Sequence, residues 1–483
     1  MMHRGTTRFN GRCGGARLLH TGIAAALALV SASAGADQFH YNNVVLGERA
    51  VGLGGAFTAV ADDASGAHYN PAGLAFALSN DISGSANAIY NKKIVYKDAF
   101  AGEDFTENAG GTFAPFFGIL QKMDKQVPGL VAAFAYYTTD TELKDQNDFF
   151  KDKVRSERLR LDRLHRTVQQ RAATTHLALA AGYRMTSTIA LGGGLTYTQV
   201  SELTQEYQDV QQSTLGDPAG ALAGQTVRRD VLARNLRESL EAGAIEPTIG
   251  VQMALGSSFS IGAMVRKGFY TSQKLTRDIE NTQLQFGSSN AAQPVSDATP
   301  AVSQRSVAES KFDKPLGSMP AMARFGAAWF ASTRFLWTFD VIYHEGSSGA
   351  EKIGAQAMYG RDPVLNFATG AEYFMVPSVP LRLGLFTNND ARPEVKEAAG
   401  TINCGNPNGA NYDPFSSFCN QRDSIDYIGQ SIFFAWVQPN SQIALGAVLQ
   451  QGKGKAQKIG ASQEVQDVTA SAYSIGFSAT QSF

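Results

Sequence analysis

From residue 81 to the end of the chain, segments of alternating polar and apolar residues recur, each about ten residues long. Successive side chains of a β-strand point to opposite faces, so each segment would form a strand with one apolar and one polar face. We expect fourteen strands, at 81–91, 110–120, 129–139, 172–185, 188–200, 243–256, 258–270, 317–330, 333–346, 363–375, 380–390, 428–437, 441–450 and 469–483.

The connections between these segments alternate strictly between two kinds. The tight ones are 121–128, 186–187, 257, 331–332, 376–379 and 438–440, and the long polar ones are 92–109, 140–171, 201–242, 271–316, 347–362, 391–427 and 451–468. Short periplasmic turns and long external loops are typical of outer-membrane barrels. A soluble multi-domain β protein is the weaker alternative, because it has no reason to place every long loop on one side. We therefore predict an all-β fold, a 14-stranded antiparallel transmembrane β-barrel.

The last segment shows the alternation most clearly. One face would carry Tyr473, Ile475, Phe477, Ala479 and the terminal Phe483, and the other Ser474, Gly476, Ser478, Thr480 and Ser482. In a barrel the apolar face would meet outer-membrane lipid. A terminal Phe on such a strand is similar to the signal that the barrel-assembly machinery reads. Segment 333–346 behaves alike, with Phe335, Trp337, Phe339, Val341 and Tyr343 on one face and Thr338, Asp340 and His344 on the other.

The first 36 residues read as an export signal. A basic region with Arg4, Arg8, Arg12 and Arg17 precedes the apolar run 21–30, and Ala34-Gly35-Ala36 is a cleavage site. The apolar run is too short to be a membrane anchor, which needs about 20 residues. Removing these residues changes the formal net charge from −1 to −5. That mild charge argues against nucleic acid as a partner, because a nucleic-acid-binding protein would carry a basic patch.

Two cysteines remain after cleavage of the signal. Cys404 and Cys419 lie in one polar connection, and an exported protein meets an oxidising compartment, so we predict a disulfide between them. A metal site is the weaker interpretation, because no His lies near either cysteine.

Residues 37–80 do not have a strand pattern and form a compact glycine-rich segment that we call the hatch. Gly52, Gly54 and Gly55 allow tight turns and close packing. Asn70 is suited to cap a short helix with Pro71 and Ala72 as its first residues. Asp62 and Asp63 would cap a short turn in a similar way. The segment has the right size to plug a barrel, so we divide the chain into 1–36 (signal peptide), 37–80 (hatch) and 81–483 (barrel).

Several alternative functions fit the residues less well. Gly52-Leu53-Gly54 is half of a dinucleotide-binding fingerprint, but no strand precedes it and Phe57 stands where a Gly or Ala is needed. Asp62-Asp63 as a catalytic or metal-binding pair is less probable than as helix caps. An outer-membrane hydrolase would need a Ser/His or Asp/His arrangement, and the five His outside the signal have no motif-like partner nearby. We expect no enzyme activity, no metal and no cofactor.

The long connection 141–171 is rich in charge and in helix-forming residues. Leu161, Leu164 and Val168 recur at helical spacing. This pattern predicts a surface helix in an external loop. A nucleic-acid-binding arm is the alternative, which the interleaved acidic residues disfavour.

Several strings of the chain resemble FadL-type outer-membrane proteins, which transport long-chain fatty acids and hydrocarbons. The hatch carries Gly47-x-Arg49-Ala50-x-Gly52-x-Gly54-Gly55-Ala56, then Ala61-Asp62-Asp63-Ala64, then Asn70-Pro71-Ala72-Gly73-Leu74. Later strings that look similar are Met319-Pro320, Thr338-Phe339-Asp340, and Tyr373 through Pro380-Leu381-Arg382-Leu383-Gly384. The resemblance implies a barrel plugged by the hatch in the bacterial outer membrane. It also implies passive entry of hydrophobic small molecules, which then leave laterally into the membrane.

The hatch string is also similar to two kinds of relative without lipid transport. One is a barrel of type IX secretion, and the other is a barrel-like conjugation protein. A secretion- or conjugation-linked scaffold therefore stays open as an alternative function.

A transporter of amphiphiles needs polar anchors in its lumen. Alternation predicts inward-facing Arg184, Arg266, Arg324 and Arg382, with His176 and His344 also inward. Each Arg would either bind substrate or pair with a hatch acid such as Asp62 or Asp63. The resemblance implies that Phe39, near the mature N-terminus, contacts the ligand; simple hatch packing is the alternative.

Two further expectations concern the route. The FadL-type lateral exit depends on a kink in the third strand, but segment 129–139 has no Gly or Pro after its first residue, Gly129, so the exit would lie elsewhere or be absent. An apolar landing site in the long external loops would involve Leu215, Leu222, Leu284 and Phe286.

Overall fold

The computed structural model describes residues 39–100, 102–154, 157–287, 293–296, 298–348, 352–353, 356–357, 360–395, 423–457 and 465–483. The predicted signal peptide and the predicted Cys404–Cys419 disulfide lie outside these residues. The disulfide stays a prediction, which mass spectrometry of the unreduced protein would test.

Strands make up most of the described chain. They are β1 (Asp81–Phe100), β2 (Glu103–Lys122), β3 (Leu130–Val154), β4 (Leu159–Arg184), β5 (Ile189–Leu215), β6 (Thr226–Leu255), β7 (Phe259–Lys267), β8 (Phe269–Gly287), β9 (Val302–Asp313), β10 (Ala321–Ser332), β11 (Phe335–His344), β12 (Lys352–Ile353), β13 (Gln356–Ala357), β14 (Val364–Val376), β15 (Val379–Asn388), β16 (Ser424–Gln438), β17 (Ser441–Gln457) and β18 (Val465–Ser482). The hatch contributes the short helices α2 (Glu48–Gly52), α3 (Gly66–Tyr69) and η1 (Pro71–Phe76).

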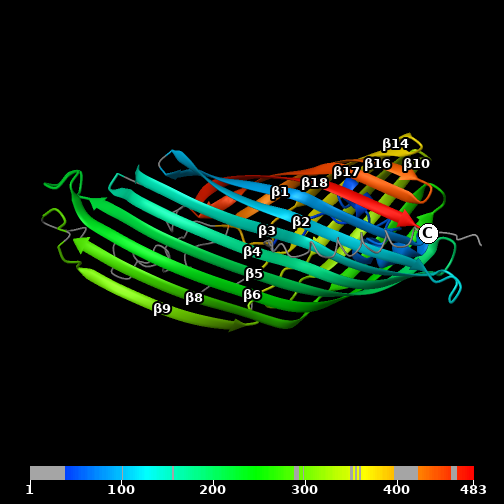
Figure 1. Ribbon diagram of the computed structural model, residues 1–483, viewed down its shortest axis with the longest axis horizontal. Helices are drawn as coiled ribbons and strands as arrows, with labels where there is room; N and C mark the ends of the chain where they lie inside the picture. Colours follow the sequence, from blue (N-terminus) through cyan, green and yellow to red (C-terminus); the bar gives the residue numbers. More distant parts are fainter. Residues whose placement is uncertain are drawn as a thin grey trace, which may run out of the picture. The chain divides into compact units, whose positions relative to one another are not determined.

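The main sheet closes on itself. β1 pairs antiparallel with β2 on one side and with the last strand, β18, on the other. β8 continues β7 after Gly268 along the same neighbour, β6, and β9 pairs with β8. The ring is therefore a closed barrel of 14 antiparallel strands, as the sequence predicted (Figure 1).

The outer face of the barrel is apolar. On β11, Trp337 and Tyr343 are 44% and 46% exposed, whereas Asp340 and His344 are buried. On β18, Tyr473 and its apolar neighbours on the same face are also exposed. Soluble monomers rarely expose apolar surface of this extent. The predicted inward and outward faces of these two strands are confirmed, and the outward face suits a bilayer.

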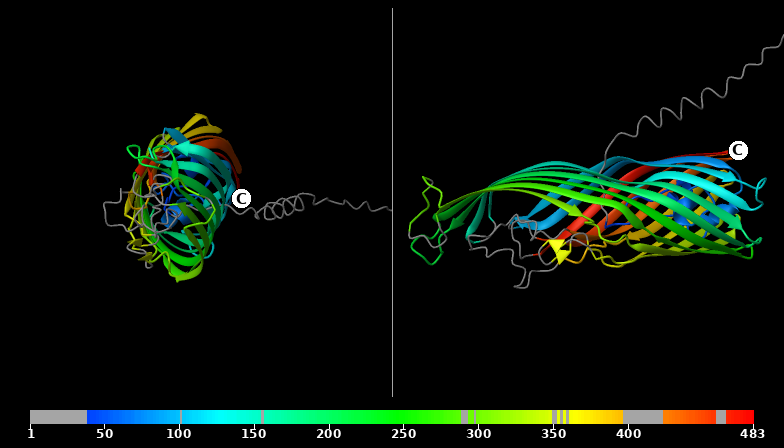
Figure 2. Two further views of the ribbon diagram at one scale, coloured as in Figure 1. Left: turned by 90° about the vertical axis from the view of Figure 1, so that its left-hand side faces the viewer. Right: turned by 90° about the horizontal axis from the view of Figure 1, so that it is seen from below.

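One half of the barrel wall is much taller than the other. β3, β4, β5 and β6 have 25, 26, 27 and 30 residues, whereas β11 has 10. A tilted strand crosses a bilayer with about 9–11 residues, so the long strands continue well beyond it (Figures 1 and 2). The predicted loops 92–109, 140–171, 201–242 and 271–316 are thus wrong, because most of their residues extend the strands.

The predicted surface helix within 141–171 is also wrong. Residues 141–154 belong to β3 and residues 159–171 to β4. The helical spacing of Leu161 and Leu164 has another cause. The β4–β5 register shifts between Leu161 and Arg163, and an extra residue in a bulge lets positions three apart share one face. Leu161, Leu164 and Val168 are all buried on that face.

The hatch lies inside the ring of strands (Figure 2). A Cβ atom at Gly192 of β5 would overlap the backbone of Pro71 and Ala72, and one at Gly384 of β15 would overlap Gly54. Only glycine permits such close approach of two backbones. The short helices predicted for the hatch are confirmed, and inward glycines of the wall let them seat.

Candidate functional site

Charged side chains join the hatch to the barrel wall. We call the end of the barrel that holds the hatch the inner end and the opposite end the outer end. Arg382 Nε donates to Glu372 Oε2 at 2.7 Å and Arg382 Nη1 donates to Glu48 Oε1 at 2.8 Å. Arg49 of α2 donates to Glu372 Oε1 at 2.9 Å and lies 3.3 Å from Asp62. The Arg382, Glu372 and Glu48 side chains are 2%, 3% and 7% exposed. We call Glu48, Arg49, Asp62, Glu372 and Arg382 the hatch ion cluster.

A second anchor comes from Asp340 on β11. Its Oδ2 accepts hydrogen bonds from the Phe57 and Thr58 nitrogens at 3.2 and 3.1 Å, and from Thr58 Oγ1 at 2.5 Å. Nearby, Arg324 donates to the Gly55 carbonyl at 3.3 Å and its guanidinium lies 4.8 Å from the Tyr69 ring centroid. These contacts fix the turn of the hatch that follows α2.

The Asn70 side chain caps η1. Its Oδ1 accepts from the Ala72 nitrogen at 3.2 Å, with Pro71 as the first residue of the helix. Asn70 Nδ2 also donates to the Thr58 carbonyl at 2.9 Å and to the Val251 carbonyl of β6 at 3.1 Å. Asn70 therefore links two parts of the hatch and the wall.

Asp63 caps the turn before α3. Its Oδ1 accepts from the Ser65 nitrogen at 2.8 Å and from Ser65 Oγ at 2.5 Å. Gly54 and Gly55 adopt φ of +64° and +83°, which side chains other than glycine rarely allow. Gly52 packs against the Arg382 side chain. Most hatch motif residues thus act through backbone shape and caps, whereas Asp62, predicted as a cap, pairs with Arg49.

A cavity of about 140 Å³ lies between the hatch and the wall, and we call it the luminal cavity. Its ionisable lining residues are His40, His68, His176, His344, Asp140, Glu246, Arg266 and Arg361. The rest of its lining includes Tyr41, Val200, Tyr270, Met319, Pro320 and Met322. Polar and apolar groups therefore share the walls of the cavity.

A chain of hydrogen bonds holds His176. Its Nδ1 lies 2.7 Å from Thr198 Oγ1, and Thr198 in turn donates to Glu246. Since the Thr198 proton goes to Glu246, Thr198 accepts from His176 Nδ1–H. His176 Nε2 then accepts from Thr139 Oγ1 at 2.8 Å. These hydrogen bonds occupy both ring nitrogens of His176, so neither nitrogen is available to a ligand.

Arg266 and His68 form another part of the lining. Arg266 Nη2 donates to the His68 carbonyl at 2.7 Å, and Arg266 Nε donates to Thr248 Oγ1 at 3.1 Å. His68 Nδ1 lies 3.2 Å from Tyr137 Oη. Burial, with the nearby positive charge of Arg266, lowers the pKa of His68 well below its usual value, so His68 is neutral.

Phe39 lies deep in the lumen but not in the cavity lining. Its side chain is 4% exposed and packs with Val200, Leu240, Leu275, Leu316, Val364 and Ala391. The guanidinium groups of Arg392 and Arg361 lie 4.7 and 5.6 Å from its ring centroid. Phe39 of the hatch thus packs against the wall beside the cavity, since Arg361 and Val200 also line the cavity.

The four arginines that were predicted to face inward make different contacts. Arg266 lines the luminal cavity. Arg324 and Arg382 contact the hatch as described above, and Arg184 Nε donates to the Ala75 carbonyl at 3.0 Å. Pairing of a wall Arg with Asp62 or Asp63 was the expected alternative. The acids found beside Arg382 are Glu48 and Glu372 instead.

The barrel wall has an interruption next to the cavity. Between β2 and β3, pairs run from Phe116–Tyr137 to Lys122–Val131 and then include Gly110–Leu143. Within the described strands, no backbone pairs join 111–115 to 138–142. The β3–β4 register also shifts between Thr138 and Asp140. The third strand is therefore irregular without Gly or Pro inside it, and Thr139 and Asp140 at this place line the cavity.

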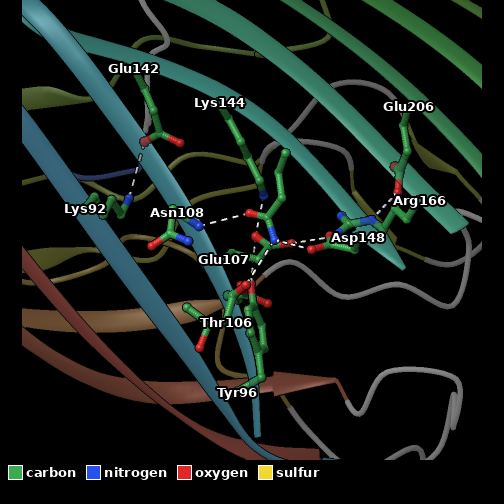
Figure 3. A network of polar contacts seen from close by, with 12 residues as sticks. Lys92, Tyr96, Thr106, Glu107, Asn108, Glu142, Lys144, Asp148, Arg166 and Glu206 are labelled. Carbon is green, nitrogen blue, oxygen red and sulfur yellow. Dashed lines mark hydrogen bonds and ion pairs between the residues drawn. The ribbon is translucent and has the colours of Figure 1, made fainter. Parts of the chain in front are cut away.

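Beyond the interruption, side chains take over from backbone pairing. Glu107 of β2 accepts from Lys144 of β3 and from Arg166 of β4, the latter at 2.5 Å. Arg166 also donates to Glu206 at 2.8 Å. Figure 3 shows Glu107 and Arg166 joined in this network, which also includes Tyr96 and Asp148, and beside it the separate ion pair of Lys92 and Glu142. We call the network around Glu107 and Arg166 the outer ion network.

Apolar side chains gather at the same outer level. They come from both halves of the wall and include Tyr96, Phe105, Leu161, Leu164, Val210, Leu232, Ile425, Tyr427 and Val468. The predicted landing residues Leu215, Leu222, Leu284 and Phe286 are not among them. Sequence reasoning missed this outer apolar cluster because its members were assigned to loops and come from seven strands.

The comparisons with known proteins agree on the fold. No protein-family model matches the sequence, and a search of curated proteins finds no match. Among solved structures, a Pseudomonas aeruginosa FadL homologue has 11% identity and a TM-score of 0.54, over 94% of this chain and 100% of that chain.

Two hydrocarbon channels are also similar. The P. putida toluene transporter TodX has 12% identity and a TM-score of 0.55, over 91% of this chain and 98% of that chain. The CymD monoaromatic hydrocarbon channel has 15% identity and a TM-score of 0.51, over 92% and 99% of the two chains. TodX is described as a toluene transporter, CymD as a monoaromatic hydrocarbon channel, and the third protein as a FadL homologue. This chain therefore has the fold of the FadL-type barrels, a closed 14-stranded barrel with short helices at its N-terminus.

Proposed function

We propose that this protein is a bacterial outer-membrane channel for the passive uptake of hydrophobic small molecules. The observation that carries the proposal is the interruption between β2 and β3 beside the luminal cavity. An unpaired stretch of wall gives a lumen compound a side exit at the level of the cavity. The proteins of similar fold are described as FadL homologues and monoaromatic hydrocarbon channels, which supports the same function.

The route would begin at the outer apolar cluster, pass to the luminal cavity and end at the interruption. Apolar residues at the outer level would concentrate a hydrophobic compound, because each buried CH₂ contributes about 0.8 kcal/mol. The hatch, locked by the hatch ion cluster and Asp340, blocks the direct way to the periplasm. Lateral release into outer-membrane lipid is then the way out.

The size of the luminal cavity favours small substrates. A cavity of about 150 Å³ in another protein holds benzene, and the luminal cavity has about 140 Å³. A long-chain fatty acid would extend beyond it. Fatty acids and hydrocarbons are both included in the proposal, with the ring-sized compounds preferred.

Membrane insertion is part of the same proposal. We infer that Phe483, which directly follows β18, is read by the barrel-assembly machinery, because β18 offers an exposed apolar face and this exposed aromatic residue comes after its last residue.

A crosslink across the interruption tests the route. Ala114 and Thr139 are opposite each other if the β2–β3 register continues through the gap. In a background with Cys404→Ser and Cys419→Ser, we expect Ala114→Cys/Thr139→Cys treated with a bifunctional thiol reagent to lose tracer uptake into liposomes. A radiolabelled monoaromatic hydrocarbon is the tracer. The matched control is Ile119→Cys/Phe134→Cys, which joins residues that are already paired and should leave uptake unchanged.

Two results would contradict the proposal. Full uptake after complete crosslinking at 114 and 139 would mean that compounds do not leave through this gap. Absence of tracer uptake by the unmodified protein would favour the alternative, a secretion- or conjugation-linked scaffold without transport.

A further inference from the structure

Two aromatic rings in the luminal cavity stack face to face. Tyr41 of the hatch and His344 of β11 have ring centroids 3.8 Å apart and an interplanar angle of 8°. Both rings line the cavity, and His344 is 5% exposed. One ring belongs to the hatch and the other to the barrel wall, so the pair joins these two parts at the cavity.

Each of these rings carries a polar atom that lacks a protein partner in the described structure. They are Tyr41 Oη and His344 Nδ1, both shielded from solvent. In contrast, His176 of the same lining has both ring nitrogens satisfied. A buried polar group without a partner is destabilising, so these two atoms favour a guest that can hydrogen-bond to them.

Another part of the lining is apolar and adaptable. Met319, Pro320, Met322 and Val200 supply it. Methionine side chains adjust to irregular shapes and make favourable contacts with aromatic ring edges. The cavity therefore offers an apolar wall for a ring and two hydrogen-bonding atoms for a single substituent.

The charges of the lining oppose an ionic guest. Two cations, Arg266 and Arg361, are balanced by two acids, Asp140 and Glu246. Arg266 is engaged by the His68 carbonyl and Thr248. A carboxylate would add an unbalanced negative charge to a lining whose two cations and two acids already balance, whereas a neutral hydroxyl would not.

We propose that the luminal cavity selects a single-ring aromatic compound with a neutral hydroxyl group, the phenol class, over an unsubstituted hydrocarbon. The proposal rests on the proposed function, since it names the substrate class of the same channel. The hydroxyl bonds to Tyr41 Oη and His344 Nδ1 while the ring lies against Met319 and Met322. A hydroxyl can reproduce the hydrogen bonds of a water that it displaces from these atoms, and toluene cannot.

Binding of phenol, toluene and benzoate to the purified full chain in detergent, measured by calorimetry, tests this selection. Tyr41→Phe removes one hydroxyl and keeps the ring stack. We expect it to weaken phenol binding by about three- to tenfold, the effect of one hydrogen bond, and to leave toluene binding unchanged. His344→Phe should act in the same direction. The matched control is Tyr343→Phe, whose ring faces outward at 46% exposure and should change neither ligand.

The outcomes separate the two proposals. Equal effects of Tyr41→Phe and His344→Phe on phenol and toluene, or no effect on phenol, would overturn the phenol selection. Benzoate binding as tight as phenol binding would also overturn it. None of these results depends on flux, so the phenol selection can fail while tracer uptake persists, and uptake can fail while phenol binding persists.

Discussion

The two ends of the barrel lumen are held together in different ways. At the inner end, Arg382 and Glu372 of the hatch ion cluster are enclosed, at 2% and 3% exposed, whereas Arg49 and Asp62 of the same cluster are 20% and 36% exposed. At the outer end, the side chains of the outer ion network keep some contact with solvent; Arg166 is 21% exposed and Glu206 is 16% exposed. The Arg382–Glu372 pair is thus buried as in a protein core, whereas the Arg166–Glu206 pair is partly open to solvent.

Backbone pairing follows the same division. β2 and β3 pair continuously beside the hatch, from 116 to 122, but their pairing is interrupted further out. Side-chain bonds then bridge the strands, such as Gln146 Nε2 to the Thr106 carbonyl at 2.9 Å. A barrel wall can therefore open locally where side-chain contacts replace backbone hydrogen bonds. Ion pairs between side chains weaken when salt is added, whereas backbone hydrogen bonds do not.

The largest expected effect is at the inner end. Arg382→Leu would leave Glu48 and Glu372 buried with less positive charge beside them. Removal of one partner of a buried ion pair costs about 3–5 kcal/mol. We expect this loss in the free energy of unfolding of the reconstituted protein, measured by urea titration. Arg184→Leu is the control, because Arg184 is exposed and contacts the hatch through the Ala75 carbonyl and the Phe76 ring, without a carboxylate partner among these contacts; equal losses for both variants would show that enclosure of the charges is unimportant.

The second effect concerns the seat of the hatch. Gly192→Val would force the hatch away from β5, because the added side chain overlaps Pro71 and Ala72. Overpacking costs about 1–3 kcal/mol. We expect increased leakage of small polar solutes through the protein in liposomes. Gly193→Val is the control, since a Cβ there meets only the Thr248 carbonyl oxygen, at 3.8 Å; leakage through it as well would point to the strand rather than to the seat.

A smaller effect is expected for the cap of η1. Asn70→Ala removes the bond to the Ala72 nitrogen, and loss of an N-cap costs about 0.5–2 kcal/mol. Because strand pairing closes the barrel without Asn70, heat-modifiable migration on gels should be unchanged. Hydrophobic tracer uptake or leakage should change instead. Failure of the barrel to assemble would mean that the hatch is part of the folding core.

The smallest effect is expected at the outer end. Arg166→Ala should change overall stability by about 0–1 kcal/mol, as for partly exposed ion pairs. Hydrogen exchange should nevertheless increase in 103–110 and 141–150 on either side of the interruption. Addition of salt to unmodified protein should act in the same direction, because salt screens charges that contact solvent. Salt-induced exchange at 48–76 of equal size would erase the distinction between the two ends.

Much of the barrel was predictable from local pattern. Alternation places Trp337 outward and Asp340 inward whatever the partner strands are, because successive side chains of a strand change face. The short turns and the cap at Asn70 also depend on neighbouring residues only. For this reason the strand number and the faces of β11 and β18 were predicted correctly.

The heights of the strands were not predictable in this way. In the outer part of β4, the buried Leu161, Leu164 and Val168 stand among charged residues and a bulge interrupts the alternation, so this stretch resembles a loop or a helix. Only the pairing with β3 and β5 identifies it as strand. The bulge at Asp162 then produced a false helical spacing.

By itself, the sequence determined the closed barrel, the inward and outward faces and the short helices of the hatch, because these follow from periodicity and from residues close together in the chain. The tertiary structure decided which inward groups meet. Arg382 and Glu48 are 334 positions apart, and the stacked rings of Tyr41 and His344 come from the plug and the far wall. No local pattern encodes such pairs, because their partners are chosen by how the hatch seats within the ring, and that seating is decided by the packing of the whole barrel.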